Sequence, residues 1–147
     1  MPTFEQYQGE YGELLSTYTT TRNFEPTIAR IKANQKRYEQ VEELTGVPWY
    51  FIGALHYRES NCDFSTHLHN GDPLTSRTRQ VPKGRPTTGT PPFTWEESAV
   101  DALKYDGLDK VTDWTPERMC YEGEKFNGFG YRKKGINSPY LWSGTDV

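Results

Sequence analysis

Hydrophobic residues recur at helical spacing through most of the chain and predict a mainly helical protein. In the segment 47–60, apolar side chains repeat at i, i+3 and i+4, which predicts a helix with one buried face. Similar stripes predict further helices at residues 4–15, 26–44, 95–106 and 116–127. Thr94 and Glu97 form a capping box that starts one of them, and Thr115 precedes a first-turn proline in another.

Residues 61–92 lack this periodicity. They contain five prolines and three glycines, and they predict loops and a small hairpin with a turn at Asn70–Gly71 or at Lys83–Gly84. The expected fold class is therefore α+β, mainly α. We expect a single domain over residues 1–147, with a small irregular β and loop lobe that forms one wall of a cleft.

One position on the apolar face of the 47–60 helix carries a charge. Glu59 lies at i+7 from Ile52, on the stripe that also holds Leu55 and His56. A carboxyl that loses hydration favours its protonated form, which is the form that a general acid needs. Glu59 is thus a candidate catalytic acid. The alternative is a helix-terminal glutamate whose stem packs on the core while its head reaches water or an arginine.

The composition suits a carbohydrate groove. Only 33% of the residues are hydrophobic, yet 14% are aromatic, with ten Tyr and four Trp. Such rings can stack on sugar faces, although Tyr can also fill the margins of a polar core. A net charge of −3 argues against a nucleic-acid binder with a broad basic face. Basic residues gather at 77–85 and 132–134, which indicates solvated loops or a local contact with an anionic polymer.

The sequence suggests no cofactor and no membrane span. Cys62 and Cys120 lack the spacing of a zinc site, and the sequence leaves open whether they pair. No apolar stretch reaches the length of a membrane helix. The first residues are acidic and polar and do not resemble a signal peptide.

The run from Gly53 to Ser65 is an apolar helix that ends in Glu59-Ser60, followed by a short polar loop with Phe64. It resembles the helix end of the lysozyme-like superfamily, which includes goose-type lysozymes and soluble lytic transglycosylases. In that superfamily the Glu protonates the glycosidic oxygen of peptidoglycan. The resemblance implies the same role for Glu59 and a lysozyme-like domain.

A second segment, Lys125 to Tyr131, resembles the Tyr-Asn-x-Gly segment that lines the saccharide groove of transglycosylases, with Phe126 in place of the usual Tyr. The resemblance implies that Phe126, Asn127 and Tyr131 bind substrate. Asn127 would hydrogen-bond an N-acetyl group, and Tyr131 would stack on the sugar or hydrogen-bond to it. Residues 138–145 would suit the aromatic closing segment of such a domain.

The superfamily's Gly-Leu-Met-Gln-type stretch is not found downstream of Glu59. Residues 70–75 and a basic, proline-rich stretch stand there instead, so the resemblance reaches the superfamily and no particular subfamily. Asp72, 13 residues after Glu59, is the first candidate for a second catalytic carboxylate. Asn-Gly-Asp-Pro is also a good turn sequence in which an aspartate needs no catalytic duty.

Five further residues in and after the 47–60 helix have weaker assignments. Thr75 could hold a catalytic water or a carboxylate, or could simply start a strand. Asp63 is expected to cap or close the loop. His56 could hydrogen-bond the Glu59 carboxyl or line the groove. His67 and His69 have alternate spacing that suggests a metal, but no third ligand is evident, so no metal site is expected.

These features predict a peptidoglycan hydrolase, a muramidase that cleaves the β-1,4 bond between N-acetylmuramic acid and N-acetylglucosamine. Its partner would be the bacterial cell wall, with no nucleic acid and no membrane span, and it would act as a monomer. We expect a cytoplasmic, endolysin-like antimicrobial protein that is released to the periplasm or the exterior by a phage-type or secretion-device route. The alternatives are a lytic transglycosylase or chitinase on the same groove, a non-catalytic cell-wall-binding or virion module, and a zinc amidase or peptidase that uses His67 and His69.

Overall fold

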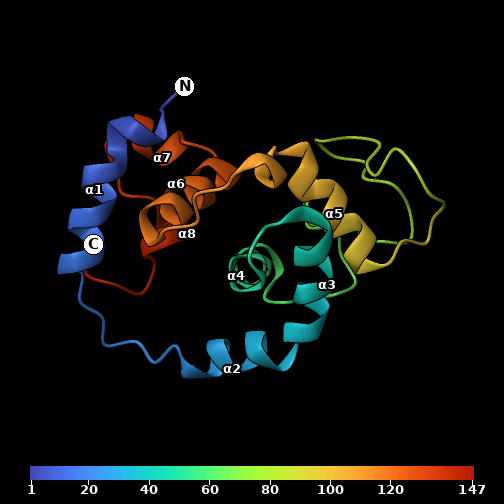
Figure 1. Cartoon of the computed structure of the whole chain (residues 1–147), viewed down its shortest axis with the longest axis horizontal. Helices are drawn as coiled ribbons and strands as arrows, with labels where there is room; N and C mark the ends of the chain where they lie inside the picture. The colour runs from blue at the N-terminus through green and yellow to red at the C-terminus, as the bar shows by residue number, and fades with distance from the viewer. The chain divides into compact units, whose positions relative to one another are not determined.

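The computed structural model describes residues 1–147 and is mainly helical, with 54% of the residues in helices and no β-sheet (Figure 1). The chain divides into two compact units. Residues 25–112 form the central unit, and residues 1–24 and 113–147 form the terminal unit. The residues expected to form a single domain thus contain two such units, and each has buried residues of its own.

The five predicted helices lie where the hydrophobic pattern places them, with one exception described below, but the pattern did not predict the short helices at 108–110, 130–133 and 139–142. The terminal unit contains α1 (Phe4–Thr17), α6 (Pro116–Asn127), α7 (Gly130–Lys133) and α8 (Pro139–Trp142). The central unit contains α2 (Glu25–Ala33), α3 (Gln35–Thr45), α4 (Trp49–Ser60), α5 (Trp95–Tyr105) and the 3₁₀ helix η1 (Leu108–Lys110). Both predicted start signals are present, because the hydroxyls of Thr94 and Thr115 accept hydrogen bonds from the first turns of α5 and α6.

The core of the central unit forms where α3 packs against α4 and α5. Tyr38 of α3 is fully buried, and its ring lies 5.7 Å from the rings of both His56 in α4 and Trp95 in α5. The face of α4 that was predicted to be buried is buried, and it carries Ile52 and Leu55 beside His56. The amphipathic pattern of α4 is therefore confirmed.

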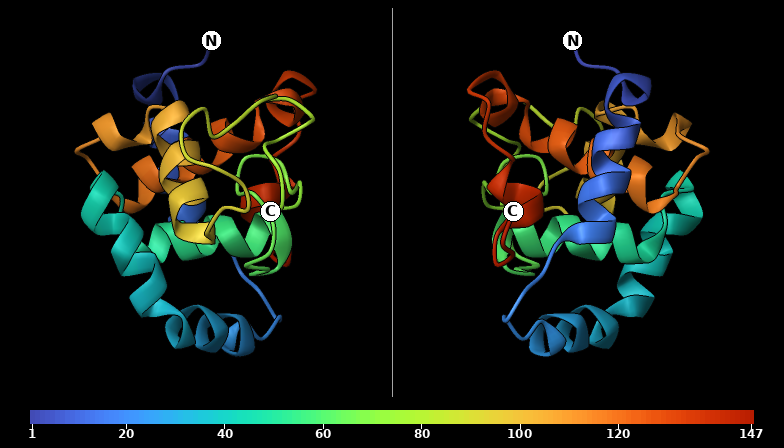
Figure 2. Two further views of the ribbon diagram at one scale, coloured as in Figure 1. Left: turned by 90° about the vertical axis from the view of Figure 1, so that its right-hand side faces the viewer. Right: turned by 90° about the vertical axis from the view of Figure 1, so that its left-hand side faces the viewer.

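The predicted helix 26–44 is wrong in one respect, because α2 and α3 occupy this segment. The ribbon changes direction between them (Figure 2). Asn34 separates them, and its side-chain amide donates to the carbonyl oxygen of Arg30 at 2.9 Å. A side chain that bonds the backbone in this way competes with continued helix. The predicted stripe therefore spans a break, and its end residues Ile28 and Leu44 are 48% and 64% exposed.

The structure contains no sheet where the small β lobe was expected. Residues 61–94 form loops, and their one element of β-pairing is an isolated bridge between Thr66 and Pro73. The five prolines lack the N–H group that a ladder of hydrogen bonds requires. Gly71 and Gly84 have φ values of 85° and 79°, as expected at the two proposed turns.

In the terminal unit, α1 packs against α6. The buried cluster between them contains Phe4, Tyr11, Tyr121 and Phe129. No helix in either unit combines the length and the apolar character needed to cross a membrane.

The packing of α4 gives a stability prediction at Gly53. A Cβ atom there would overlap the Cγ2 methyl of Ile31 and lie 3.2 Å from Cε2 of Tyr38. We expect Gly53→Ala to destabilise the protein by about 1–3 kcal/mol, because overpacking outweighs the gain in helix propensity. Chemical denaturation of the variant and the wild type measures the difference.

Gly9→Ala is the matched control, because Gly9 is also in a helix but its Cβ would meet no atom within 4 Å. We expect it to be neutral or to stabilise by up to about 1 kcal/mol. A Gly53→Ala protein as stable as Gly9→Ala would contradict the close packing of α4.

Candidate functional site

Glu59 is the penultimate residue of α4 and is half-buried. The helix stops directly after it, because Asn61 and Cys62 both adopt left-handed backbone conformations with φ values of 55° and 63°. The N–H groups of Asn61 and Cys62 donate to the carbonyls of the last turn. Glu59 is thus the charged residue at the end of an otherwise buried helix face, next to a sharply defined turn.

His56 lies one turn before Glu59 and is only 1% exposed. Its Nε2–H donates to the carbonyl of Asp63 at 2.8 Å, so its Nδ1 accepts from the hydroxyl of Tyr38 at 2.9 Å. Burial lowers the pKa of His56, which keeps the ring neutral. Because both ring nitrogens are engaged inside the protein, this geometry does not favour the predicted contact between His56 and substrate. It gives His56 a structural role, which is to tie α4 to the turn that follows Glu59.

The same turn is held by Asp63. Its Oδ1 accepts from the backbone N–H of Ser65 at 2.8 Å and from the hydroxyl of Ser65 at 2.6 Å. These hydrogen bonds lower the pKa of the Asp63 carboxyl, which is therefore ionised at neutral pH. The contacts match the expectation that Asp63 closes the loop.

Asp72 braces the long loop. Its Oδ2 accepts from the backbone N–H groups of Arg79 and Gln80 at 2.9 and 3.0 Å, and from the side-chain amide of Asn70 at 3.0 Å. These hydrogen bonds, led by the one from Gln80, lower the pKa of Asp72. A carboxylate with a lowered pKa is a weak proton acceptor, which does not favour Asp72 as a catalytic base. That role stays a prediction. Thr75, on the same loop, is exposed, and its predicted role also stays a prediction.

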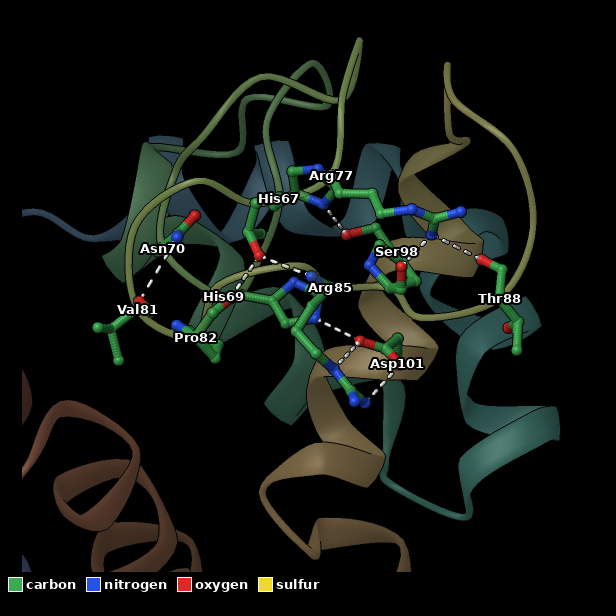
Figure 3. A network of polar contacts seen from close by, with 12 residues as sticks. His67, His69, Asn70, Arg77, Val81, Pro82, Arg85, Thr88, Ser98 and Asp101 are labelled. Carbon is green, nitrogen blue, oxygen red and sulfur yellow. Dashed lines mark hydrogen bonds and ion pairs between the residues drawn. The ribbon is translucent and has the colours of Figure 1, made fainter.

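His67 and His69 fasten this loop to α5 (Figure 3). Nε2–H of His67 donates to the carbonyl of Ser76 at 2.7 Å, and the hydroxyl of Ser98 donates to its Nδ1 at 2.7 Å. Nε2–H of His69 donates to Oδ2 of Asp101 at 2.7 Å. Three of the four ring nitrogens therefore have protein partners. Zinc binding through both rings would have to break these bonds, which disfavours the zinc amidase or peptidase alternative.

Two arginines of the basic cluster at residues 77–85 bind groups of the protein itself. Arg85 donates to both carboxylate oxygens of Asp101, with Nε at 3.1 Å and Nη2 at 2.8 Å (Figure 3). Arg77 donates to the carbonyls of Pro86, Thr88 and Gly89. These two arginines hold the loop together, and the expectation of a fully solvated basic loop is wrong for both.

The predicted glycan-binding residues belong to the terminal unit, whereas Glu59 and Asp72 belong to the central unit. Asn127 ends α6, and Tyr131 lies in α7. Both line one pocket of about 180 Å³. Its full lining is Asn127, Gly128, Gly130, Tyr131 and Lys134. Phe126 is half-buried and is not part of the lining. The sequence indicated Lys134 only as part of the basic cluster 132–134.

The terminal unit contains a buried polar network that the sequence did not predict. Glu124 accepts from the hydroxyl of Tyr11 at 2.7 Å and from Nε and Nη2 of Arg132 at 3.1 and 3.0 Å. Arg132 also donates to Glu10 at 2.8 Å. Burial and the neighbouring Glu124 raise the pKa of Tyr11. Arg132 is thus committed to the interior, and no periodicity or motif marked it as such.

Both cysteines carry free thiols. Burial raises the pKa of Cys120 to about 12, which makes its thiolate scarce at neutral pH. Comparisons of the chain with protein-family models, curated proteins and solved structures find no match.

The contacts of Asp72 predict a pH-dependent stability. Its carboxylate has a lowered pKa, so the stabilisation is complete above its ordinary value of about 3.9 and is lost as the pH falls through the folded value. We expect Asp72→Asn to melt at a lower temperature than the wild type at pH 7, and the difference to shrink as the pH falls below about 3.9. Thermal melts across this range measure it.

Glu43→Gln is the control, because Glu43 is an exposed carboxylate without a hydrogen bond or ion pair. It should melt like the wild type at every pH. An Asp72→Asn protein with unchanged melting at pH 7 would show that the loop does not depend on this carboxylate.

Proposed function

We propose that this protein is a peptidoglycan-cleaving muramidase in which Glu59 is the general acid. The observation that carries the proposal is the position of Glu59. It is the charged residue at the end of the buried face of α4, half-buried, beside a turn fixed by His56 and by two left-handed residues. Catalysis by proton transfer requires a carboxyl held in one place, and such a turn supports that requirement.

In the proposed reaction, Glu59 donates its proton to the glycosidic oxygen as the bond from that oxygen to the anomeric carbon breaks. The sugar that keeps the anomeric carbon then has oxocarbenium-ion character and must be attacked by an oxygen nucleophile. If that nucleophile is water, the product has a free reducing end. The attacking oxygen gives up its proton as the new bond forms, either to the carboxylate left on Glu59 or to solvent, and Glu59 is protonated again in either case.

The terminal unit supplies the proposed glycan-binding residues. Asn127 and Tyr131 line one pocket, which supports the role that their resemblance to the transglycosylase segment implies. An amide can both donate to and accept from an acetamido group, and a phenol ring offers a flat face to a sugar.

One observation favours a second candidate, a lytic transglycosylase. That reaction uses the muramoyl 6-hydroxyl as the nucleophile and needs no second carboxylate to activate water. Because three donors occupy Oδ2 of Asp72, this residue is a poor base, and the single-carboxylate reaction gains support.

We expect Glu59→Gln to lose at least about 100-fold in the rate of cell-wall lysis, because the amide has no acidic proton to give. A turbidity assay on bacterial cell walls measures it, with Glu43→Gln as the control that should keep full activity. Lysis should also withstand EDTA. Activity of Glu59→Gln above about a tenth of the wild-type rate, or lysis abolished by EDTA, would overturn the proposal.

The released products identify the nucleophile. If Asp72 activates water, Asp72→Asn should lose about tenfold or more in activity, and mass spectrometry of the wild-type products should find reducing ends. If the muramoyl 6-hydroxyl attacks, the products are 1,6-anhydro sugars and Asp72→Asn retains its activity at temperatures where it is folded. Reducing-end products together with a fully active Asp72→Asn would exclude Asp72 as the base.

A further inference from the structure

The pocket at the end of α6 contains three polar side chains whose ends have no protein partner. Asn127, Tyr131 and Lys134 line this pocket of about 180 Å³, and none of their side chains makes a hydrogen bond or an ion pair within the protein. An amide, a phenol and an ammonium group therefore remain available to a ligand at one place.

A second pocket in the same unit differs in this respect. It has a volume of about 150 Å³ and is lined in part by Glu10, Glu124 and Arg132. Those charges satisfy one another through hydrogen bonds of 2.8 to 3.1 Å. Of these two pockets, the first is better suited to bind an anion, because the ammonium group of Lys134 has no carboxylate partner.

The three side chains of the first pocket define the chemistry of the ligand. Asn127 can pair with an acetamido group through its carbonyl and its amide. Tyr131 is 40% exposed and offers a ring face to a sugar. Lys134 adds a positive charge, which suits an anionic group carried by the same glycan.

The backbone at this pocket leaves room for a ligand. Gly128 and Gly130 both line it, and an added Cβ would meet no atom within 4 Å at either position. Gly128 has a φ of 96°, which disfavours other residues, but Gly130 has no such restriction. A side chain at Gly130 can therefore narrow the pocket without a clash inside the unit.

We propose that this pocket binds a carboxylate carried by an N-acetylated glycan, and that Lys134 selects the anionic glycan over a neutral one. The choice of glycan rests on the proposed function. In peptidoglycan the carboxylate has two possible sources, the lactyl group of a muramoyl residue without a peptide and the acidic residues of the stem peptide. A chitin oligosaccharide has the acetamido groups but no carboxylate.

The test measures binding by isothermal titration calorimetry, with the full-length Glu59→Gln protein as the parent so that no ligand is cleaved. The ligands are a peptide-free muramoyl oligosaccharide, the same oligosaccharide with its stem peptides, and a chitin oligosaccharide of equal length. We expect Lys134→Ala to weaken binding of a carboxylate ligand by roughly three- to tenfold and to leave the chitin oligosaccharide unchanged. Lys134→Arg should retain the preference, and added salt should reduce it.

Two matched controls separate this role from a structural one. Lys133→Ala removes a neighbouring exposed charge that does not line the pocket, and it should change binding of no ligand. Gly130→Ala should weaken all three ligands, whereas Gly9→Ala, in a helix elsewhere in the unit, should weaken none.

The carboxylate source follows from which ligand responds to Lys134→Ala. A response from the peptide-free sugar identifies the lactyl carboxylate, and a response only from the peptide-bearing sugar identifies the stem peptide. Equal weakening of the anionic and neutral ligands by Lys134→Ala, no weakening of any ligand, or full binding by Gly130→Ala would overturn the proposal.

Its failure can be told apart from failure of the proposed function. If lysis depends on Glu59 while Lys134→Ala does not discriminate between the ligands, only the pocket proposal fails. If carboxylate binding depends on Lys134 while the wild-type protein lyses no cell walls, the pocket proposal stands and the muramidase proposal fails.

Discussion

Polar side chains provide for residues 61–94 the hydrogen bonds that a β-ladder provides in other folds. A long loop inside a compact unit has backbone groups that must be satisfied without a neighbouring strand. Here His67 donates to one backbone carbonyl of the loop, and Arg77 donates to three others. Asp72 accepts from two backbone N–H groups of the loop. Asp101 then anchors the loop to α5 through His69 and Arg85. Polar residues that look functional in the sequence are therefore mostly the scaffold of this loop.

This scaffold leaves few groups near Glu59 free for chemistry. The side chains of His56, Ser60 and Asp63 all make hydrogen bonds within the turn after α4. A rigid frame of this kind would suit the role proposed for Glu59, because general acid catalysis depends on the position of the acid. The terminal unit also contains both kinds of basic residue. Arg132 is hydrogen-bonded to Glu124 inside the unit, whereas Lys134 lines a pocket and can bind a ligand.

The helices could be predicted from the sequence because they depend on local signals. The capping hydroxyls of Thr94 and Thr115 and the buried stripe of α4 are examples. The break at Asn34 was not predicted, because the apolar stripe continues past it. The pattern gives no sign of the side-chain hydrogen bond from Asn34 that competes with the helix. For the candidate site, the roles of Asn127 and Tyr131 were predicted from the resemblance of a short segment, and they stay predictions. The sequence could not show which groups pair with Arg132, because two of its partners, Glu10 and Tyr11, are 122 and 121 residues away in the chain.

The division of the chain into units also constrains how the protein can assemble. The central unit is one continuous segment, so all of its contacts are available once residue 112 has left the ribosome. The terminal unit is made from the two ends, and α1 can bury Phe4 and Tyr11 only after α6 has been synthesised. During translation, Phe4 and Tyr11 of α1 therefore lack their partners in α6 until more than a hundred further residues have been added to the chain. The helix carries three glutamates, Glu5, Glu10 and Glu13, and charged residues of this kind oppose aggregation of an exposed apolar segment.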